Sequence, residues 1–134
     1  MRYLAIDHGQ KRTGLALCDA DEKVVSPLSV VETGRTLIPK IREVVEEYGT
    51  EAFVVGLPYN MDGTEGPRAA EVRRFAETLT AAIPLPLEFF DERLSSFEAR
   101  EKLLGLELTR KGKKKRIDAV AAAAILQGFL DAKT

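Results

Sequence analysis

Hydrophobic residues in the first quarter of the chain alternate with polar ones, or run together, over lengths typical of β-strands. Residues 2–7 and 13–19 show this pattern, and Gly9 marks the turn between them. Residues 24–32 form a third such run, in which Pro27 suits an edge strand or a bulge. We therefore expect three antiparallel strands that begin with a hairpin.

The middle of the chain changes to helical spacing. After Thr36, a residue type that caps helices, apolar positions recur at helical intervals until Gly49 ends the segment. Residues 52–57 are wholly apolar, which indicates a strand buried on both faces of a parallel sheet. A second helix is predicted to begin at Pro67, with an apolar stripe that continues to Ile83.

The last third adds one strand and two helices. Residues 87–90 are predicted to form the fifth strand, which ends at acids, and Ser95–Glu98 fits the capping box of a third helix. Ile117 starts the apolar and alanine positions of a last helix. The predicted order is βββαβαβαα, within a single domain of residues 1–134. Right-handed crossovers then give an α/β fold: a mixed five-stranded sheet, order 3-2-1-4-5 with strand 2 antiparallel, flanked by helices.

Composition excludes several classes of protein. Apolar residues make up 45% and charged residues 31%, the balance of a globular domain. No apolar run has the length of a membrane span and the start lacks a signal-peptide pattern, so we expect a cytoplasmic protein with no membrane partner. The sole cysteine, Cys18, excludes internal disulfides and a thiol metal cluster, and we expect it to be a small core residue.

The net charge of −1 hides an uneven distribution. Six of the 20 basic residues lie within residues 110–116, which leaves 14 basic against 21 acidic residues, or −7, in the rest of the chain. This basic run directly precedes Asp118 and would attract a polyanion that the acids otherwise repel. The run consists of Arg110, Lys111, Lys113, Lys114, Lys115 and Arg116.

Carboxylates stand at three places where an α/β sheet presents chemistry. Asp7 ends the first strand, Asp91 or Glu92 ends the fifth, and Asp118 lies in the first turn of the last helix. Such a cluster repels itself unless a cation is bound, and carboxylate oxygens favour Mg²⁺ or Mn²⁺. Two ions about 3.5–4 Å apart would activate a water and stabilise the departing oxygen of a phosphodiester.

Each acid also has a structural alternative. Asp118 would complement a helix dipole, Asp7 would stabilise a turn, and Asp91 or Glu92 would pair with a nearby arginine, Arg93 or Arg100. Only their joint placement favours catalysis. At the fifth strand we prefer Glu92, because the two strand-end acids start about 10 Å apart and the longer side chain bridges that gap better.

Other residues near these acids suit nucleic acid. His8 either tunes a metal-bound water near neutral pH or is a solvated turn residue. For Asn60 we weigh a phosphate contact against a loop role, and we interpret Asp62–Gly63 as a turn. Few aromatic residues are available to stack on bases, so we expect recognition of backbone and shape. The nucleic-acid-binding candidates outside the basic run are Lys11, Arg12, Asn60 and Arg93.

Four motifs, in this order and spacing, give the chain a family resemblance. IDHGQKRTGLALCD, VVGLPYNMDGTEGP, FFDERLSS and KKRIDAVAAAAILQGFLD resemble the YqgF/RuvX family over nearly the whole chain. The resemblance implies a ribonuclease H-like fold and a metal-dependent nuclease. The family is described both as Holliday junction resolvases and as the nucleases that mature the 5′ end of pre-16S ribosomal RNA.

The family's metal-binding and catalytic acids carry over onto Asp7, Glu92 and Asp118. Two positions depart from the family pattern. His8 stands where a small or β-branched residue is usual, and Ser95–Ser96 stands where threonines are usual.

Our leading hypothesis is an ester-bond hydrolase, a nuclease that uses Mg²⁺ or Mn²⁺, with two ions expected, on structured RNA or DNA. We interpret it as an endonuclease acting as a monomer or a homodimer. One alternative is a non-catalytic RNA-binding module in ribosome assembly. The other is a nucleotide-binding domain like those of actin and sugar kinases, but that fold closes two such domains around ATP and this chain supplies one.

Overall fold

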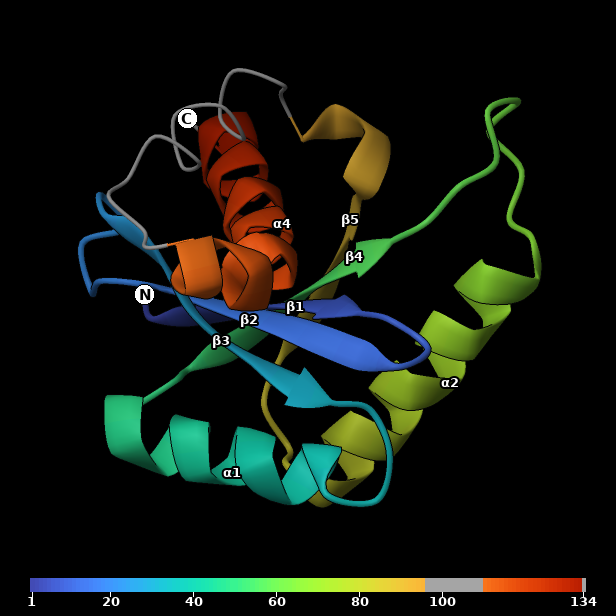
Figure 1. The fold of residues 1–134 in the computed structure, drawn as a ribbon. Helices are drawn as coiled ribbons and strands as arrows, with labels where there is room; N and C mark the ends of the chain where they lie inside the picture. The colour runs from blue at the N-terminus through green and yellow to red at the C-terminus, as the bar shows by residue number, and fades with distance from the viewer. Residues whose placement is uncertain (96–109, 134) are drawn as a thin grey trace.

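The computed structural model describes residues 1–95 and 110–133, with side chains for 1–95 and 119–133. Its strands form one mixed sheet in the predicted order, β3-β2-β1-β4-β5 (Figure 1). β1 pairs with β2 and β2 with β3 in antiparallel fashion, whereas β4 is parallel to both β1 and β5. The elements are β1 (Tyr3–His8), β2 (Arg12–Cys18), β3 (Val25–Glu32), α1 (Leu37–Tyr48), β4 (Ala52–Leu57), α2 (Pro67–Ala82), β5 (Leu87–Asp91), η1 (Glu92–Leu94) and α4 (Arg110–Lys133).

The strand register fixes which residues are level with one another. Ile6 of β1 is paired with Val55 of β4, and Gly56 of β4 is paired with Phe90 of β5. One residue beyond the last β1–β4 pair, Asp7 is therefore level with Gly56. The predicted irregularity at Pro27 is confirmed, because the register of the edge strand β3 shifts there against β2.

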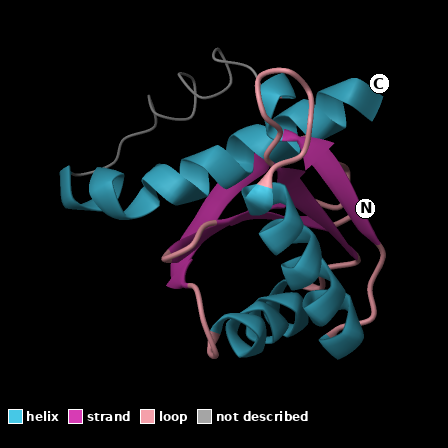
Figure 2. Ribbon diagram, turned by 90° about the vertical axis from the view of Figure 1, so that its right-hand side faces the viewer, coloured by secondary structure: helices cyan, strands magenta, loops and turns pink. Residues whose placement is uncertain are grey.

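Helices cover both faces of the sheet: α1 and α2 lie on one face and α4 on the other (Figures 1 and 2). Successive residues of a strand point to opposite faces. Leu4 and Ile6 of β1 accordingly belong to the core beneath α1 and α2, whereas Tyr3 and Ala5 belong to the core beneath α4. We call these the α1/α2 face and the α4 face.

Small residues bring α4 close to the sheet, as its alanine content predicts. Ala122 and Ala123 are fully buried against Ala5 and Ala16 of the strands. A Cβ atom added at Gly56 would lie 2.5 Å from Cδ1 of Ile125, so the helix and β4 approach closely at this glycine.

The direction of α4 is set by contacts near its end. The Nζ of Lys133 donates to the hydroxyl of Tyr3 at 2.9 Å, at the start of β1. Ile125, eight residues earlier, packs beside Gly56 at the other end of the strands. The helix therefore runs antiparallel to β1, and its N-terminal half lies toward the carboxyl ends of β1 and β4.

The beginnings of three helices were predicted from the sequence. α4 begins at Arg110 rather than Ile117, so the basic run is the first part of this helix instead of a segment before it. Thr36 occupies the N-cap position of α1, but its side chain makes no capping hydrogen bond. The third helix was predicted to begin at Ser95, and all its later residues lie outside the described part of the chain. The short helix η1 comes just before Ser95.

Cys18 is the small core residue that was predicted, only 7% exposed. Its sulfur accepts a hydrogen bond from the backbone N–H of Tyr3 and donates one to the carbonyl of Met1, both at 3.4 Å. Burial raises the pKa of this thiol. In the described parts of the chain, none of the helices is both long enough and apolar enough to traverse a bilayer.

Candidate active site

The carboxyl ends of β1, β4 and β5 form the candidate site. Asp7 follows the alternation of Tyr3 and Ala5, which places it on the α4 face. The strand order reverses direction between β1 and β4. From β1 the chain adds β2 and β3 on one side of the sheet, and from β4 it adds β5 on the other side. Such switch points are where open α/β sheets bind ligands.

Glu92, the first residue of η1 directly after β5, reaches across the end of β4. Its Oε1 and Cγ lie only 2.9 Å and 3.0 Å from where a Cβ of Gly56 would be. The side chain occupies this place because Gly56 has none of its own. Glu92 thereby spans part of the gap toward Asp7, in keeping with the preference for the longer acid at the end of β5.

Asp91, one residue earlier, has a different environment. Both its carboxylate oxygens accept hydrogen bonds from Arg93, with Nη2 of Arg93 2.7 Å from Oδ2. Oδ1 also accepts from the backbone N–H of Arg93 at 2.9 Å and so caps η1. The hydrogen bonds from the Arg93 side chain lower the pKa of Asp91. Asp91 therefore forms the ion pair with Arg93 that was the structural alternative for the acids at the end of β5.

Arg93 links β5 to the loop that follows β4. Besides its pair with Asp91, it donates from Nη1 to the carbonyl of Asn60 at 3.3 Å and lies 5.1 Å from the ring centre of Tyr59. Its side chain is 43% exposed. A nucleic-acid contact by Arg93, as predicted, would compete with these bonds.

Asp118 is located by the backbone of α4. It lies one turn before Ala122 and about two turns before Ile125, both of which are buried on the sheet side of the helix. Given the direction of α4, residue 118 lies about 10 Å along the helix axis beyond the level of Gly56, toward the carboxyl ends of the strands. Its side chain lies outside the described part.

The candidate metal ligands are carboxylates. Among the side chains that the structure describes, no three His, Cys, Asp or Glu residues form a metal-binding group, and Asp118 falls outside that comparison. Asp7 is level with Gly56 on the α4 face and Glu92 lies over Gly56, and both offer only hard carboxylate oxygens. Such ligands fit Mg²⁺ or Mn²⁺ rather than zinc.

His8 lies on the opposite face of the sheet from Asp7, which overturns both interpretations of it. Its ring stacks on Phe75 of α2 with ring centres 4.4 Å apart and planes at 26°. Burial, and secondarily the charge of Arg68, lowers its pKa below the usual value. His8 is thus neither placed beside a metal-bound water on the α4 face nor a solvated turn residue.

The remaining loop candidates have distinct surroundings. Lys11 is exposed in the turn between β1 and β2, and Arg12 is exposed at the start of β2. Asn60 bonds within its own loop: its Nδ2 donates to Oγ1 of Thr64 at 3.0 Å, and its backbone pairs with that of Thr64. Asp62 accepts from the backbone N–H and hydroxyl of Thr64, which confirms the predicted turn. Gly63 completes this turn with a φ of 88°.

Sequence reasoning missed Arg68, in the first turn of α2. Its Nη2 donates to the carbonyl of His8 at 2.6 Å, and its Nη1 pairs with Glu71. The spacing to Glu71 predicts an ordinary surface ion pair along the helix. Nothing local in the sequence signals a contact with a residue 60 positions away.

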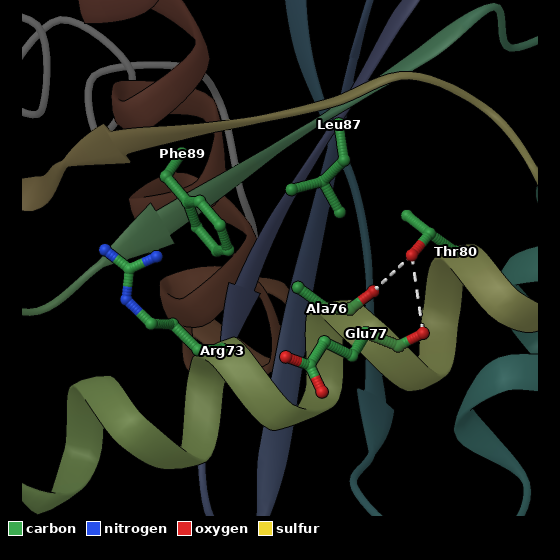
Figure 3. Close-up of a pocket in the computed structure, with 6 residues that line it drawn as sticks. All are labelled: Arg73, Ala76, Glu77, Thr80, Leu87 and Phe89. Carbon is green, nitrogen blue, oxygen red and sulfur yellow. Dashed lines mark hydrogen bonds between the residues drawn. The ribbon is translucent and has the colours of Figure 1, made fainter.

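The described residues also form a hollow of about 320 Å³ between α2 and the edge strand β5 (Figure 3). It lies on the α1/α2 face and contains none of the predicted acids. Its lining residues are Arg73, Ala76, Glu77, Thr80, Leu87 and Phe89.

A protein-family model described as "RuvX: Holliday junction resolvase" matches residues 1–132. The chain belongs to the RuvX family. Its RuvX relatives include a protein of Anaeromyxobacter sp. (strain Fw109-5), 46% identical over 135 residues that cover 99% of this chain and 98% of the relative. A protein of Moorella thermoacetica is 43% identical over 140 residues, covering 98% and 95%. Both are named "Putative pre-16S rRNA nuclease".

Solved structures agree with the ribonuclease H-like fold expected of a RuvX protein. Thermus thermophilus RuvC, solved with a Holliday junction substrate, superposes with a TM-score of 0.63 at 17% identity, covering 99% of this chain and 95% of that one. The fowlpox virus resolvase, solved with Holliday junction DNA, gives a TM-score of 0.58 at 10% identity with 99% coverage of each chain. At these identities the likeness establishes the fold.

The RuvX motifs quoted from the sequence are far apart along the chain but belong to one region of the fold. They include the end of β1, the loop after β4, the end of β5 with η1, and the N-terminal half of α4. The family resemblance and the sheet topology therefore indicate the same site.

Proposed function

We propose that this RuvX protein is a metal-dependent endonuclease that cleaves phosphodiester bonds in structured nucleic acid. The observation that carries the proposal is the position of Glu92 over Gly56, toward the strand end that bears Asp7. The names of the RuvX relatives support pre-16S rRNA as a substrate, and the description of the family model supports Holliday junction DNA as a second one. The protein would act in the cytoplasm as a single domain.

In the proposed mechanism, Asp7, Glu92 and Asp118 hold two divalent ions, Mg²⁺ or Mn²⁺. These ions would supply an activated water and charge stabilisation at the departing oxygen. Asp91 stays outside the metal set because Arg93 engages both its oxygens. The cations at the start of α4 and in the turn at Lys11 and Arg12 would bind the phosphates on either side of the cleaved bond.

Neighbouring acids provide a matched test of the catalytic assignment. Glu92→Gln and Asp7→Asn should each lower Mn²⁺-dependent cleavage by more than about a hundredfold. This loss is larger than the roughly 10–100-fold loss that is typical when a residue supporting a metal ligand is removed. Asp91→Asn removes an equal charge one residue away and should retain cleavage within a few-fold, because exposed ion pairs contribute little. The substrates would be precursor rRNA, single-stranded DNA and junction DNA. Cleavage that persists in Glu92→Gln would refute the assignment.

The basic part of α4 is tested separately by binding without metal. Lys113→Ala with Lys114→Ala should weaken binding and flatten its salt dependence by about one unit of slope per lost phosphate contact. Lys23→Ala with Lys40→Ala removes the same charge from exposed sites that lie away from Asp7, Glu92 and Asp118. This double variant should leave the salt dependence of binding unchanged. Equal slopes in the two double variants would remove the basic run from the interface.

Two further outcomes separate the alternatives. Tight RNA binding without cleavage under any divalent ion would favour a ribosome-assembly module, and tight ATP binding without nuclease activity would favour a nucleotide-binding domain. Resolution of a junction requires two cuts related by symmetry, so a homodimer is expected if junctions are cleaved in pairs. Sedimentation of the protein with and without junction DNA would measure this.

A further inference from the structure

Three side chains on one side of α2 face the carboxyl end of β1. Arg68, Glu71 and Phe75 are spaced three and four residues apart, which puts them on the same helix face. All three lie around His8, the residue that follows Asp7: Arg68 and Phe75 contact it directly, and Glu71 pairs with Arg68. We call this group the β1 clamp.

The clamp contacts the main chain of β1 beyond its pairing with β4, on a segment that β2 still pairs through His8 and Thr13. The pairing of β1 with β4 ends at Ile6 and Val55, so the carbonyl of His8 lies beyond the last residue pair of that ladder. Nη2 of Arg68 donates to this carbonyl at 2.6 Å and supplies a partner that β4 does not. The pair with Glu71 fixes the guanidinium, and the two side chains are only 36% and 35% exposed.

The clamp also holds a side chain on the face opposite the acids. The His8 ring stacks on Phe75 at 4.4 Å, while Asp7 points to the α4 face. Asp7 is thus flanked by Ile6, which is fully buried in the sheet, and by His8, which is fixed through both its carbonyl and its ring. Neither neighbour of Asp7 moves without breaking contacts.

We propose that Arg68 is a positioning residue, which acts through His8 to hold the Asp7 carboxylate where a divalent ion binds. This inference rests on the proposed function, because it assumes that Asp7 is a ligand. Metal sites require their ligands within about 0.5 Å of the productive geometry. Loss of a residue that orients a ligand typically costs about 10–100-fold in metal affinity or activity.

A second arginine of α2 provides a matched control. Arg73 also forms a pair with a glutamate, Glu65, and also lies against an aromatic ring, Phe89 at 4.9 Å (Figure 3). It contacts the edge strand β5 instead of β1. Arg68→Ala and Arg73→Ala therefore remove similar interactions from the same helix, but only the first removes a contact with the end of β1.

The experiment measures Mn²⁺ affinity from free Mn²⁺ by electron paramagnetic resonance, alongside kcat and KM for cleavage. We expect Arg68→Ala to weaken Mn²⁺ binding and lower kcat by about tenfold, with KM for nucleic acid changed less than about twofold. Arg73→Ala should match the parent, and Arg68→Lys, which keeps a donor, should recover part of the loss. Equal Mn²⁺ affinity in the two alanine variants, or a change in KM alone, would overturn the proposal.

Two further variants keep the test decisive if Arg68→Ala does not fold. Glu71→Gln leaves Arg68 but removes its fixed partner, and Phe75→Leu removes the seat of the His8 ring while keeping an apolar side chain. Each should weaken Mn²⁺ binding by a few-fold, and parent-like affinity in both would refute the clamp. Asp7→Asn separates the two proposals: if it binds Mn²⁺ and cleaves like the parent, the assignment of Asp7 fails, whatever Arg68 does.

Discussion

The core beneath α4 contains more alanines than the core beneath α1 and α2. Beneath α1 and α2, fully buried large residues such as Leu4, Phe53 and Leu79 fill the space. Beneath α4, large side chains such as Phe90 and Phe129 are accompanied by alanines of the helix and the strands, and Gly56 lets Ile125 of the helix approach β4. Large side chains separate layers and bury more apolar area, whereas small ones allow two backbones to come together.

Neighbouring residues of β1 belong to these two environments. Asp7 lies on the α4 face, where small residues leave room for Glu92 beside it. His8 lies on the α1/α2 face, where α2 holds it. The α1/α2 face thus holds the end of β1 in place, and the α4 face bears the acids to which the proposed function assigns catalysis.

The largest expected effect is on stability and comes from the α1/α2 face. Phe53 is fully buried in this core. Phe53→Ala should therefore lower the free energy of unfolding by about 3–5 kcal/mol. Cleavage per folded molecule should change little, because Phe53 lies on the face away from Glu92. Urea denaturation and cleavage assays would measure the two quantities. A loss of cleavage larger than the loss of folded protein would contradict the division between faces.

The next effect is expected at Gly56, where both stability and activity should fall. Gly56→Ala places a Cβ against Cδ1 of Ile125 and Oε1 of Glu92, and such overpacking costs about 1–3 kcal/mol. Adding Ile125→Val removes the obstructing Cδ1 and should recover part of the stability. Cleavage should stay low in the double variant, since Glu92 is still displaced. Recovery of full cleavage together with stability would show that the place of Glu92 does not matter.

The smallest effect concerns pH and the stacked His8. Because burial lowers its pKa below 6.5, the folded protein disfavours protonated His8 more than the unfolded chain does. The free energy of unfolding of the parent should therefore decrease as pH falls from about 7 to 5. His8→Phe retains a flat ring on Phe75 but does not titrate, so its decrease over the same interval should be smaller. Denaturant titrations at both pH values would test this, and identical decreases would refute it.

Periodicity and topology were enough to predict the sheet. The alternation in β1 and β2, the apolar run of β4 and the parallel crossovers leave few arrangements, and the order 3-2-1-4-5 follows. Side-chain reach predicted that Glu92 rather than Asp91 would extend toward β1. Both predictions depend on local pattern and on distances that every sheet shares.

Contacts between distant segments were not predictable in the same way. The place of His8 depends on Phe75 and Arg68, which come to it only through the packing of α2. The start of α4 was missed because lysines and Gly112 carry no apolar period, although lysine itself favours helices. The sequence suggested an ion pair between Arg93 and a neighbouring acid, but it left open whether Asp91 or Glu92 would take part.

The buried thiol of Cys18 makes the protein convenient for site-directed labelling. It is the only cysteine in the sequence, it is closed to solvent, and its raised pKa keeps it protonated at neutral pH. A maleimide dye should therefore react selectively with a cysteine introduced at Met61, which is fully exposed in the loop beside Asn60. Fluorescence from that position would report nucleic acid arriving at the site without any change to the acids.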